Sequence, residues 1–393
     1  MADRLKERIA RAIRERREEI ARVAEEIFDH PEVGHQEFFA SDLLTRILAR
    51  NGYEVTRPWP ALPTGFCAVL RGGAPGPRVA LLAEYDALPG LGHACGHNLI
   101  AAGVLGAALG LAAVRDELPG EVIVFGTPAE ESNGGKVTLV EEGALAGVHA
   151  ALMFHPGDAN VLEVSSLALD ALEFVFKGRP THASSGPQEG INALDAVVQF
   201  FNLINSLRPY LKNNVHINGI ITEGGVTPNI IPERAVARFY IRAENRRDLK
   251  EAIRRVENCA RAAALAVGAT FTYHRYELSY EAMVTNRALA GAFRENLLAL
   301  GVTELAPPRR IRGSLDMGNV SRVVPSIHPY LALGRDKVIP HTGEFARAAR
   351  REEGKELALL AAQALAWTAA DVLLDAGLLS RIQAEFRAYC SED

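Results

Sequence analysis

The sequence has few cysteines and no run of about 18 uncharged apolar residues that is free of glycine breaks and fits a membrane span. The four cysteines, Cys67, Cys95, Cys259 and Cys390, are scattered, so no disulfide framework is indicated. A net charge of −5 argues against nucleic acid or an anionic membrane as a partner. The most apolar segment, residues 99–114, is short and rich in small residues, which is typical of a buried helix and not of a membrane span.

The first 29 residues show an amphipathic helical pattern without the apolar core of a secretion signal. Together with the scattered cysteines, this pattern leads us to expect a reduced, cytoplasmic setting. A chain of 393 residues is longer than one ordinary hydrophobic core supports, so two domains are expected.

Strand and helix patterns alternate over the first 155 residues. The predicted helices cover residues 3–29, 41–51, 99–114 and 137–142. The predicted strands cover residues 67–70, 79–83, 121–126 and 149–154. This alternation predicts an α/β fold, with a mostly parallel sheet and helices on both faces.

The pattern changes to β-α-β-β-α-β between residues 168 and 282, which is the ferredoxin-like order of an α+β domain. We therefore expect an inserted domain at 168–282 and a discontinuous domain made of residues 1–167 and 283–393. After the insertion we expect an irregular stretch at 312–325 and a long helix at 353–374.

Residues 83–98 form a loop that is unusually rich in possible ligand atoms. Within it, Cys95 and His97 flank a glycine, so a thiolate and an imidazole can face one point, as zinc and similar metals require. Taken alone, the motif is equally compatible with a buried thiol beside ordinary polar residues.

Polar side chains follow three successive predicted strands. Glu84 and Asp86 follow the first, Glu130 and Glu131 the second, and His155 the third. Each by itself is typical of a solvated loop residue. Because ligands bind at the carboxyl ends of strands in open α/β sheets, the three together predict one site.

Several motifs are specific enough to indicate a family. They are His93-Ala94-Cys95-Gly96-His97, Pro128-Ala129-Glu130-Glu131 and Gly178-Arg179-Pro180-Thr181-His182-Ala183-Ser184, with His341 near the C-terminus. Over essentially the whole chain they resemble the dinuclear-metal family of amidohydrolases and exopeptidases that includes aminoacylase, carboxypeptidase G, hippurate hydrolase and carnosinase. Residues 84–89 and 95–98 resemble its branch of aminobenzoyl-glutamate hydrolases and β-alanyl dipeptidases, and differ from hippurate-type members at Glu84 and Asn98.

The resemblance implies two divalent metal ions per chain, with zinc or manganese first and cobalt or nickel as alternatives. The implied ligands are Cys95, His97, Glu131, His155 and His341. Glu130 matches the catalytic base, and Asp86 matches a carboxylate that orients a ligand. The discontinuous domain would be a phosphorylase/hydrolase-like catalytic domain, and residues 168–282 would be its lid and dimerisation domain.

Four residues outside the metal set are candidates for contact with the substrate. His182 matches a lid histidine that reaches into the partner's active site in family homodimers, although an exposed loop histidine is more often inert. Arg242 and Asn229 lie in motifs where the family binds the substrate's carboxylate, and Asp316 lies where it lines its pocket. A surface arginine is the plain alternative for Arg242.

We therefore expect metal-dependent hydrolysis of a small amide bond in a dipeptide, an N-acyl amino acid or an aminobenzoyl-glutamate-like substrate with a free carboxylate. A metal-bridged water would attack the amide, and Glu130 would take its proton and pass it to the leaving nitrogen. Two alternatives stay open. One is an inactive homologue that binds or regulates, and the other is a desuccinylase or deacetylase of a biosynthetic intermediate.

Overall fold

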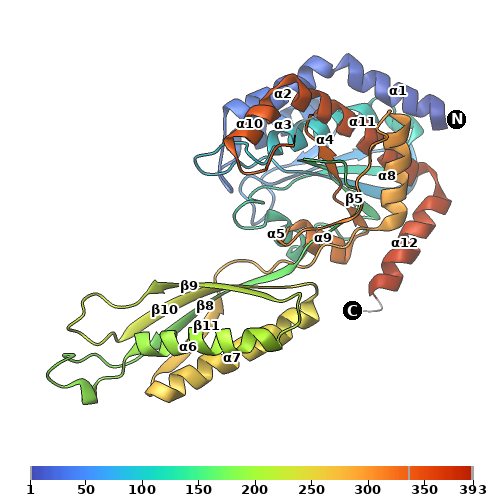
Figure 1. Ribbon diagram of the computed structural model, residues 1–393. Coiled ribbons are helices and arrows are strands. Elements are labelled where there is room, and N and C mark those ends of the chain that lie inside the picture. Colours follow the sequence, from blue (N-terminus) through green and yellow to red (C-terminus); the bar gives the residue numbers. More distant parts are fainter. Residues whose placement is uncertain (1, 335–336, 391–393) are drawn as a thin grey trace. The chain divides into compact units, whose positions relative to one another are not determined.

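The computed structural model describes residues 2–334 and 337–390, which fall into two compact units (Figure 1). The first unit consists of the described residues within Met1–Ser165, Met283–Ile311 and Asp316–Asp393. The second consists of Ser166–Ala282 and Arg312–Leu315. That the second unit serves as a lid and dimerisation domain stays a prediction.

A six-stranded sheet lies at the centre of the first unit. Its order is β1 (Glu54–Thr56), β2 (Phe66–Arg71), β4 (Pro119–Gly126), β3 (Ala74–Ala83), β5 (Ala150–Leu152) and β13 (Ser326–Ile327). β3 runs parallel to β4 and β5, and β5 runs parallel to β13, whereas β1 and β2 are antiparallel. The predicted mostly parallel α/β sheet is therefore confirmed, with an antiparallel edge. Two short parallel pairs complete the strands: β6 (His155–Gly157) with β14 (Tyr330–Ala332), and β7 (Val164–Ser165) with β12 (Arg309–Arg310).

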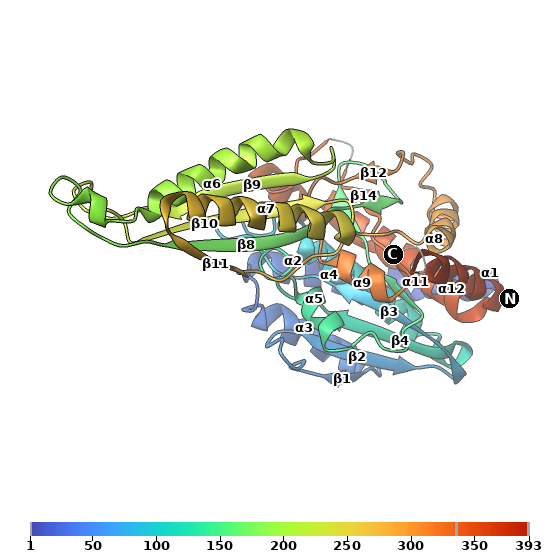
Figure 2. The same cartoon turned by 90° about the horizontal axis from the view of Figure 1, so that it is seen from below.

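Helices surround this sheet, as Figure 2 shows from below. They are α1 (Ala2–Glu15), α2 (Arg17–Asp29), α3 (Phe38–Arg50), α4 (His97–Ala112), α5 (Gly135–Glu141), α8 (Arg287–Ala299), α9 (Met317–Val323), α10 (Gly343–Arg350), α11 (Glu352–Leu374) and α12 (Ala376–Cys390), with a 3₁₀ turn at Arg115–Glu117. The helix predicted over residues 3–29 is interrupted at Arg16, which separates α1 from α2. The stretch predicted as irregular contains the short helix α9.

The apolar segment predicted as a buried helix corresponds to α4, which is buried along nearly its whole length and packs on the longer helix α11. Helix α11 is long and apolar enough to cross a membrane, but 72% of its most apolar stretch is buried inside the protein. It packs on α4 and on β3, and buried side chains lie on all its sides, which explains an apolar composition without a membrane.

The second unit is a four-stranded antiparallel sheet with two helices on one face (Figure 1). In chain order its elements are β8 (Ala168–Lys177), α6 (Ala193–Leu207), β9 (His216–Glu223), β10 (Arg234–Ala243), α7 (Arg246–Val267) and β11 (Thr270–Arg275), with 3₁₀ turns at Pro187–Glu189 and Arg208–Tyr210. The strands lie in the order β11-β8-β10-β9. This is the predicted β-α-β-β-α-β succession. Alternate residues of β8 and β10 point to the helices, so their phenylalanines form the core.

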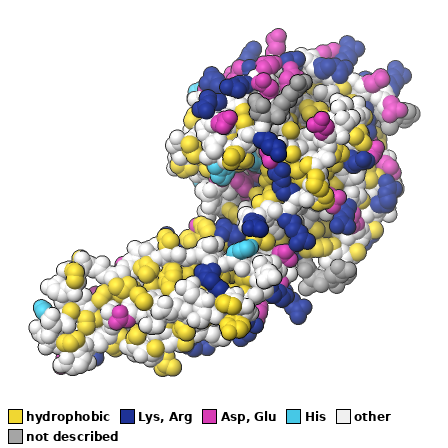
Figure 3. Space-filling model, viewed as in Figure 1, with side chains coloured by type: hydrophobic (Ala, Val, Ile, Leu, Met, Phe, Trp, Pro, Cys, Tyr) yellow, Lys and Arg dark blue, Asp and Glu magenta, His cyan; other side chains and the backbone are white. Residues whose placement is uncertain are grey.

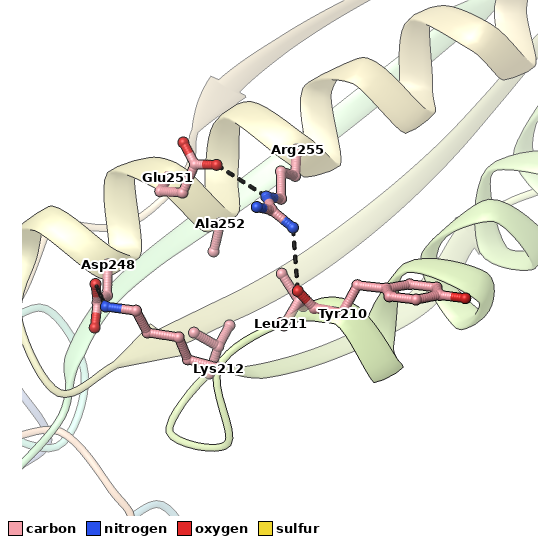
Figure 4. A pocket seen from close by; sticks show the side chains of 8 residues that line it. Tyr210, Leu211, Lys212, Asp248, Glu251, Ala252 and Arg255 are labelled. Atoms are coloured by element: carbon pink, nitrogen blue, oxygen red, sulfur yellow. Dashed lines mark hydrogen bonds and ion pairs between the residues drawn. The ribbon is translucent and has the colours of Figure 1, made fainter.

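The segment after α6 is held to the first turns of α7 by charged contacts (Figure 4). Lys212 binds Asp248, and Arg255 binds both Glu251 and the carbonyl of Tyr210. The charged side chains around this small pocket are therefore already paired.

Figure 3 shows that the charged side chains of the first unit are interspersed in sign, while the visible face of the second unit carries more apolar side chains.

Glu37 precedes α3 and braces the loop that follows β4. Its buried carboxyl oxygens accept hydrogen bonds from the N–H of Ala129 (2.8 Å) and the hydroxyl of Thr64 (2.6 Å). Burial raises the pKa of Glu37 to about 7, although the bond from Thr64 opposes the rise. Since Ala129 directly precedes Glu130, this contact fixes the backbone at the start of a candidate catalytic loop.

The packing of the second unit predicts a large loss of stability for Phe200→Ala. The Phe200 ring is fully buried, with centroids 4.9 Å from Phe174 and 5.1 Å from Phe239. Its truncation is expected to lower the free energy of unfolding by about 3–5 kcal/mol in a urea titration. Leu265→Ala, on the exposed side of α7, is the control and should change it by less than about 0.5 kcal/mol. Equal losses in the two variants would contradict this core.

Glu37 makes stability depend on pH. The folded protein keeps a proton that the unfolded chain releases above about pH 4.5, so stability falls as the pH rises toward about 7 and then levels off. The full effect is about 3 kcal/mol. Glu37→Gln keeps the acceptor for Ala129 and is neutral at every pH, so urea unfolding should show a flatter pH dependence and higher stability at pH values above the titration. The exposed Glu142→Gln is the control, and an unchanged slope in Glu37→Gln would refute this account.

Candidate metal centre

Gly96 brings Cys95 and His97 to one place. It has a φ of 79° and immediately precedes α4, so the chain turns between the two side chains. A Cβ on Gly96 would lie 3.0 Å from Pro156 and 3.2 Å from Phe345. Only glycine satisfies both the conformation and the space. Both flanking side chains are buried, with His97 fully enclosed.

Asp86 orients His97 and connects it to the loop after β4. His97 Nδ1 lies 2.9 Å from Asp86 Oδ1 and 3.0 Å from the Asp86 carbonyl, so Nδ1 carries the proton and Nε2 is left as a ligand atom. The other oxygen of Asp86 accepts the N–H of Glu131 at 2.9 Å. One carboxylate therefore positions two predicted ligands.

His155 faces Cys95 from the neighbouring strand end. Its Nδ1 donates to the carbonyl of Pro156 at 2.7 Å, and its Nε2 lies 3.4 Å from Cys95 Sγ. Burial lowers the pKa of His155 to about 4. The ring is therefore neutral near pH 7, which is the form that binds metal.

His341 approaches from a different part of the chain and meets Glu131. Its Nε2 lies 3.1 Å from Glu131 Oε1, and its backbone N–H donates to the carbonyl of Ala94 at 2.9 Å. His341 has a φ of 64°, a strained conformation for a residue with a Cβ. Burial favours the neutral acid, but the hydrogen bond from His341 opposes it, and the pKa of Glu131 is lowered to about 2.

These side chains form overlapping groups whose ligand atoms lie within 4.8 Å of one another. The groups are Cys95 with His97 and His155, Cys95 with Glu131 and His341, and His97 with Glu130 and Glu131. The structure therefore brings together all five predicted ligands and Glu130. Cys95 belongs to two of the groups, which suits a ligand shared by two ions.

The donor atoms fit divalent transition metals. Thiol, imidazole and carboxylate are the ligands that zinc and its neighbours accept. The buried atoms His97 Nε2 and Glu84 Oε2 lie 3.3 Å apart, yet neither has a hydrogen-bond partner. Buried polar atoms are rarely left without a partner, and a cation between these groups would satisfy them.

Glu130 follows a strained residue and stands among other carboxylates. Ala129 has a φ of 60°, and its carbonyl accepts the N–H groups of Asn133 and Gly134, which closes the loop tightly. Burial, and then the charges of Glu84 and Asp316, raise the pKa of Glu130 well above its ordinary value.

A buried lysine beside this centre was missed by the sequence analysis. Lys136 lies in the first turn of α5 and is fully buried, with its Nζ bonded to Glu84 and to Asp316. Asp316 was predicted to contact substrate, but the structure places it inside the first unit on this lysine. The signal available in the sequence was a charge within an otherwise apolar helix start, next to Val137.

In the second unit, His182 and Asn229 lie side by side. The N–H of Ala183 donates to the carbonyl of Asn229 at 2.9 Å, and His182 pairs with Ile230. His182 is exposed, and its Nδ1 accepts the N–H groups of Ser184 and Ser185 at 3.2 Å. Because Nδ1 acts as the acceptor, Nε2 is the ring nitrogen that is left to donate.

Arg242 lies apart from these two residues. Arg242 stands near the end of β10. Asn229 lies just before the start of that strand, and His182 lies beside Asn229, so roughly 25 Å of strand separates both residues from Arg242. Its guanidinium lies over the Tyr240 ring, 5.0 Å from the centroid, and its buried Nε has no hydrogen-bond partner. An arginine with a free donor suits a carboxylate.

Comparison with known proteins agrees with this geometry. Residues 80–363 match peptidase family M20/M25/M40. The chain is 39% identical to the Xaa-Arg dipeptidase of Mus musculus, across 99% of this chain and 94% of that protein. It is 28% identical to one of the subunits of the p-aminobenzoyl-glutamate hydrolase of Escherichia coli (strain K12), across 95% of this chain and 93% of that one.

Solved structures show the same fold. A putative aminohydrolase from methicillin-resistant Staphylococcus aureus has a TM-score of 0.79 at 20% identity, covering 94% of this chain and all of that one. A dinuclear metal-binding peptidase from Bacillus subtilis has a TM-score of 0.70 at 23% identity, covering 91% and 98%.

The family match covers most of the chain, and the Mus musculus relative aligns over nearly all of it. The resemblance seen in the sequence motifs is thereby confirmed. The cofactor of this family is divalent metal. The chain belongs to peptidase family M20/M25/M40 and is a metal-dependent hydrolase of small amide bonds.

Proposed function

We propose that the protein is a dinuclear metallo-dipeptidase that cleaves dipeptides with a free C-terminal carboxylate. The observation that carries this proposal is the pair of donor groups that share Cys95. One ion would be held by His97 and His155, and the other by Glu131 and His341, with Cys95 common to both. Zinc and manganese suit this mixed set best, and cobalt and nickel are the alternatives.

The chemistry divides among named residues. When bound, the metal ions would acidify water and polarise the amide carbonyl. Glu130 takes a proton from the attacking water and delivers it to the leaving nitrogen. Asp86 keeps His97 in the tautomer that exposes Nε2 and holds the backbone of Glu131.

A dipeptide ending in arginine is the first substrate to test. The support is the 39% identity with the Xaa-Arg dipeptidase, against 28% with the aminobenzoyl-glutamate hydrolase. Arg242, with its unpartnered Nε over Tyr240, would take the substrate's carboxylate. Aminobenzoyl-glutamate and N-acyl amino acids stay as alternative substrates.

We further propose that the protein acts as a homodimer through the second unit. His182 and Asn229 are too far from Arg242 along β10 for all three to contact one dipeptide within a single second unit. In a homodimer this separation is no obstacle, because His182 and Asn229 of one protomer would contact the substrate bound by its partner. β9 supports such an interface because it is an edge strand with Ile220 and Ile221 exposed. The cytoplasmic setting stays a prediction from the sequence.

The proposed function predicts two divalent ions per chain and cleavage that a chelator abolishes. Elemental analysis should find about two ions per chain. Hydrolysis of a panel containing Xaa-Arg dipeptides, other dipeptides, aminobenzoyl-glutamate and N-acyl amino acids should stop after chelation and return with added metal. Metal binding without cleavage of any panel member would favour the inactive homologue, and preference for an N-acyl amino acid would favour the deacetylase alternative.

Mixing two inactive variants tests the shared site. Glu130→Gln is expected to abolish turnover and His182→Ala to reduce it strongly, both with unchanged metal content, because neither removes a metal ligand. After the protomers exchange, mixed dimers contain one site with an intact Glu130 and a partner's intact His182, so activity should rise above that of either variant. Glu130→Gln mixed with Asp86→Ala is the control, because both changes lie in the first unit and no mixed site is complete. No rise in the first mixture would contradict action across the dimer.

A further inference from the structure

A charged cluster lies buried beside the metal centre, and the proposed function uses none of its three members. Lys136 Nζ donates to Glu84 Oε1 at 2.5 Å and to Asp316 Oδ1 at 2.7 Å, and all three side chains are at most 1% exposed. Taking these charges out of water is energetically costly, and their mutual attraction only partly offsets that cost. A well-packed apolar trio would fold as well, so the cluster calls for a functional explanation.

The cluster joins three parts of the first unit. Glu84 follows β3, Lys136 lies in α5, and Asp316 immediately precedes α9. Asp316 Oδ2 also accepts the backbone N–H of Lys136 at 3.1 Å, so one carboxylate holds both ends of the lysine. Asp316 therefore fixes the position of the ammonium independently of its bond to Glu84.

Glu84 uses only one of its oxygens in this cluster. Oε1 is taken by Lys136, whereas Oε2 is buried, has no hydrogen-bond partner and lies 3.3 Å from His97 Nε2. His97 Nε2 is the atom that Asp86 leaves free for metal. The unpaired oxygen and the unpaired nitrogen are thus directed to the same place.

We propose that Lys136 and Asp316 are positioning residues that hold Glu84 as an additional oxygen donor of the metal centre. This inference rests on the proposed dinuclear function and extends its ligand set beyond the five residues that the family motif supplies. The ammonium binds Glu84 Oε1 and so stops the carboxylate from rotating, which leaves Oε2 beside the ligand atom His97 Nε2. Asp316 acts through Lys136 and contacts neither metal nor substrate.

The added carboxylate changes which ion the site favours. Thiolate and imidazole select zinc, whereas carboxylate oxygen suits manganese. Glu84 with Glu131 gives the centre two carboxylates beside its softer ligands. Loss of the Glu84 charge should therefore weaken manganese binding more than zinc binding.

The test uses a variant that removes the positioning pair without changing the charge of the cluster. Lys136→Met combined with Asp316→Asn deletes one positive and one negative charge and leaves Glu84 as the single anion. Chelator competition with zinc and with manganese measures affinity, and the visible absorption of the cobalt-loaded protein reports ligand geometry. We expect manganese affinity to fall about 10- to 100-fold, zinc affinity to fall less, and the cobalt spectrum to change.

Two further variants keep the result decisive. Lys6→Met combined with Asp371→Asn removes another ion pair of the first unit, 2.7 Å long, and should leave both affinities unchanged. Glu84→Gln tests the donor itself and should reproduce the metal preference of the double variant, including in case the double variant fails to fold.

The outcomes separate this inference from the proposed function. Wild-type affinities and cobalt spectrum in a folded Lys136→Met/Asp316→Asn variant, or in Glu84→Gln, would overturn the inference and leave the dinuclear hydrolase intact. A wild-type chain that binds neither zinc nor manganese would overturn the proposed function. If the Lys6→Met/Asp371→Asn control loses as much metal affinity as the Lys136→Met/Asp316→Asn variant, the loss reflects general destabilisation of the first unit. That result would also overturn the inference.

Discussion

The parallel pairing of β4, β3 and β5 is the constraint on which the centre depends. It places three loops at one edge of the sheet, so their polar side chains meet in the interior of the first unit. Buried polar atoms need hydrogen-bond partners, and in this centre the hydrogen bonds that satisfy them also hold the neighbouring side chains and backbone in position. Asp86 orients His97 and the backbone of Glu131, while Glu37 holds the backbone just before Glu130. The predicted ligands His97 and Glu131 are therefore held in place by contacts within the protein itself.

The two units contribute different kinds of chemistry. The first unit buries thiol, imidazole and carboxylate groups in its interior, where the low dielectric constant strengthens electrostatic interactions. The second carries its phenylalanine core under two helices and leaves the polar candidates His182, Asn229 and Arg242 on loops and on a strand. Under the proposed function, reaction chemistry and substrate recognition would be encoded in separate folding units, so one could vary with little effect on the other.

Sequence patterns pointed to five side chains that the structure brings together, because Cys95, His97, Glu131 and His155 stand in short local motifs, either after a predicted strand or in the Cys95-Gly96-His97 turn, and His341 was added by the family resemblance. They were insufficient for Lys136, because a lysine is almost never fully buried and its partners lie 52 and 180 residues away. The contacts of Asp316 were missed for the same reason. The interruption at Arg16 was also invisible, since the apolar stripe continues through it and both helices bury that face. Local rules predict elements and motifs, whereas long-range pairing decides which charges are buried together.

The late position of α11 in the chain has a consequence for biosynthesis. This helix packs on α4 and β3, yet it lies at residues 352–374, after the whole of the second unit. On the ribosome, the second unit is complete long before α11 emerges, while the apolar face of α4 still lacks its cover. The first unit therefore closes only after residues 352–374 have been synthesised, and its nascent form presents the kind of exposed apolar surface that chaperones bind.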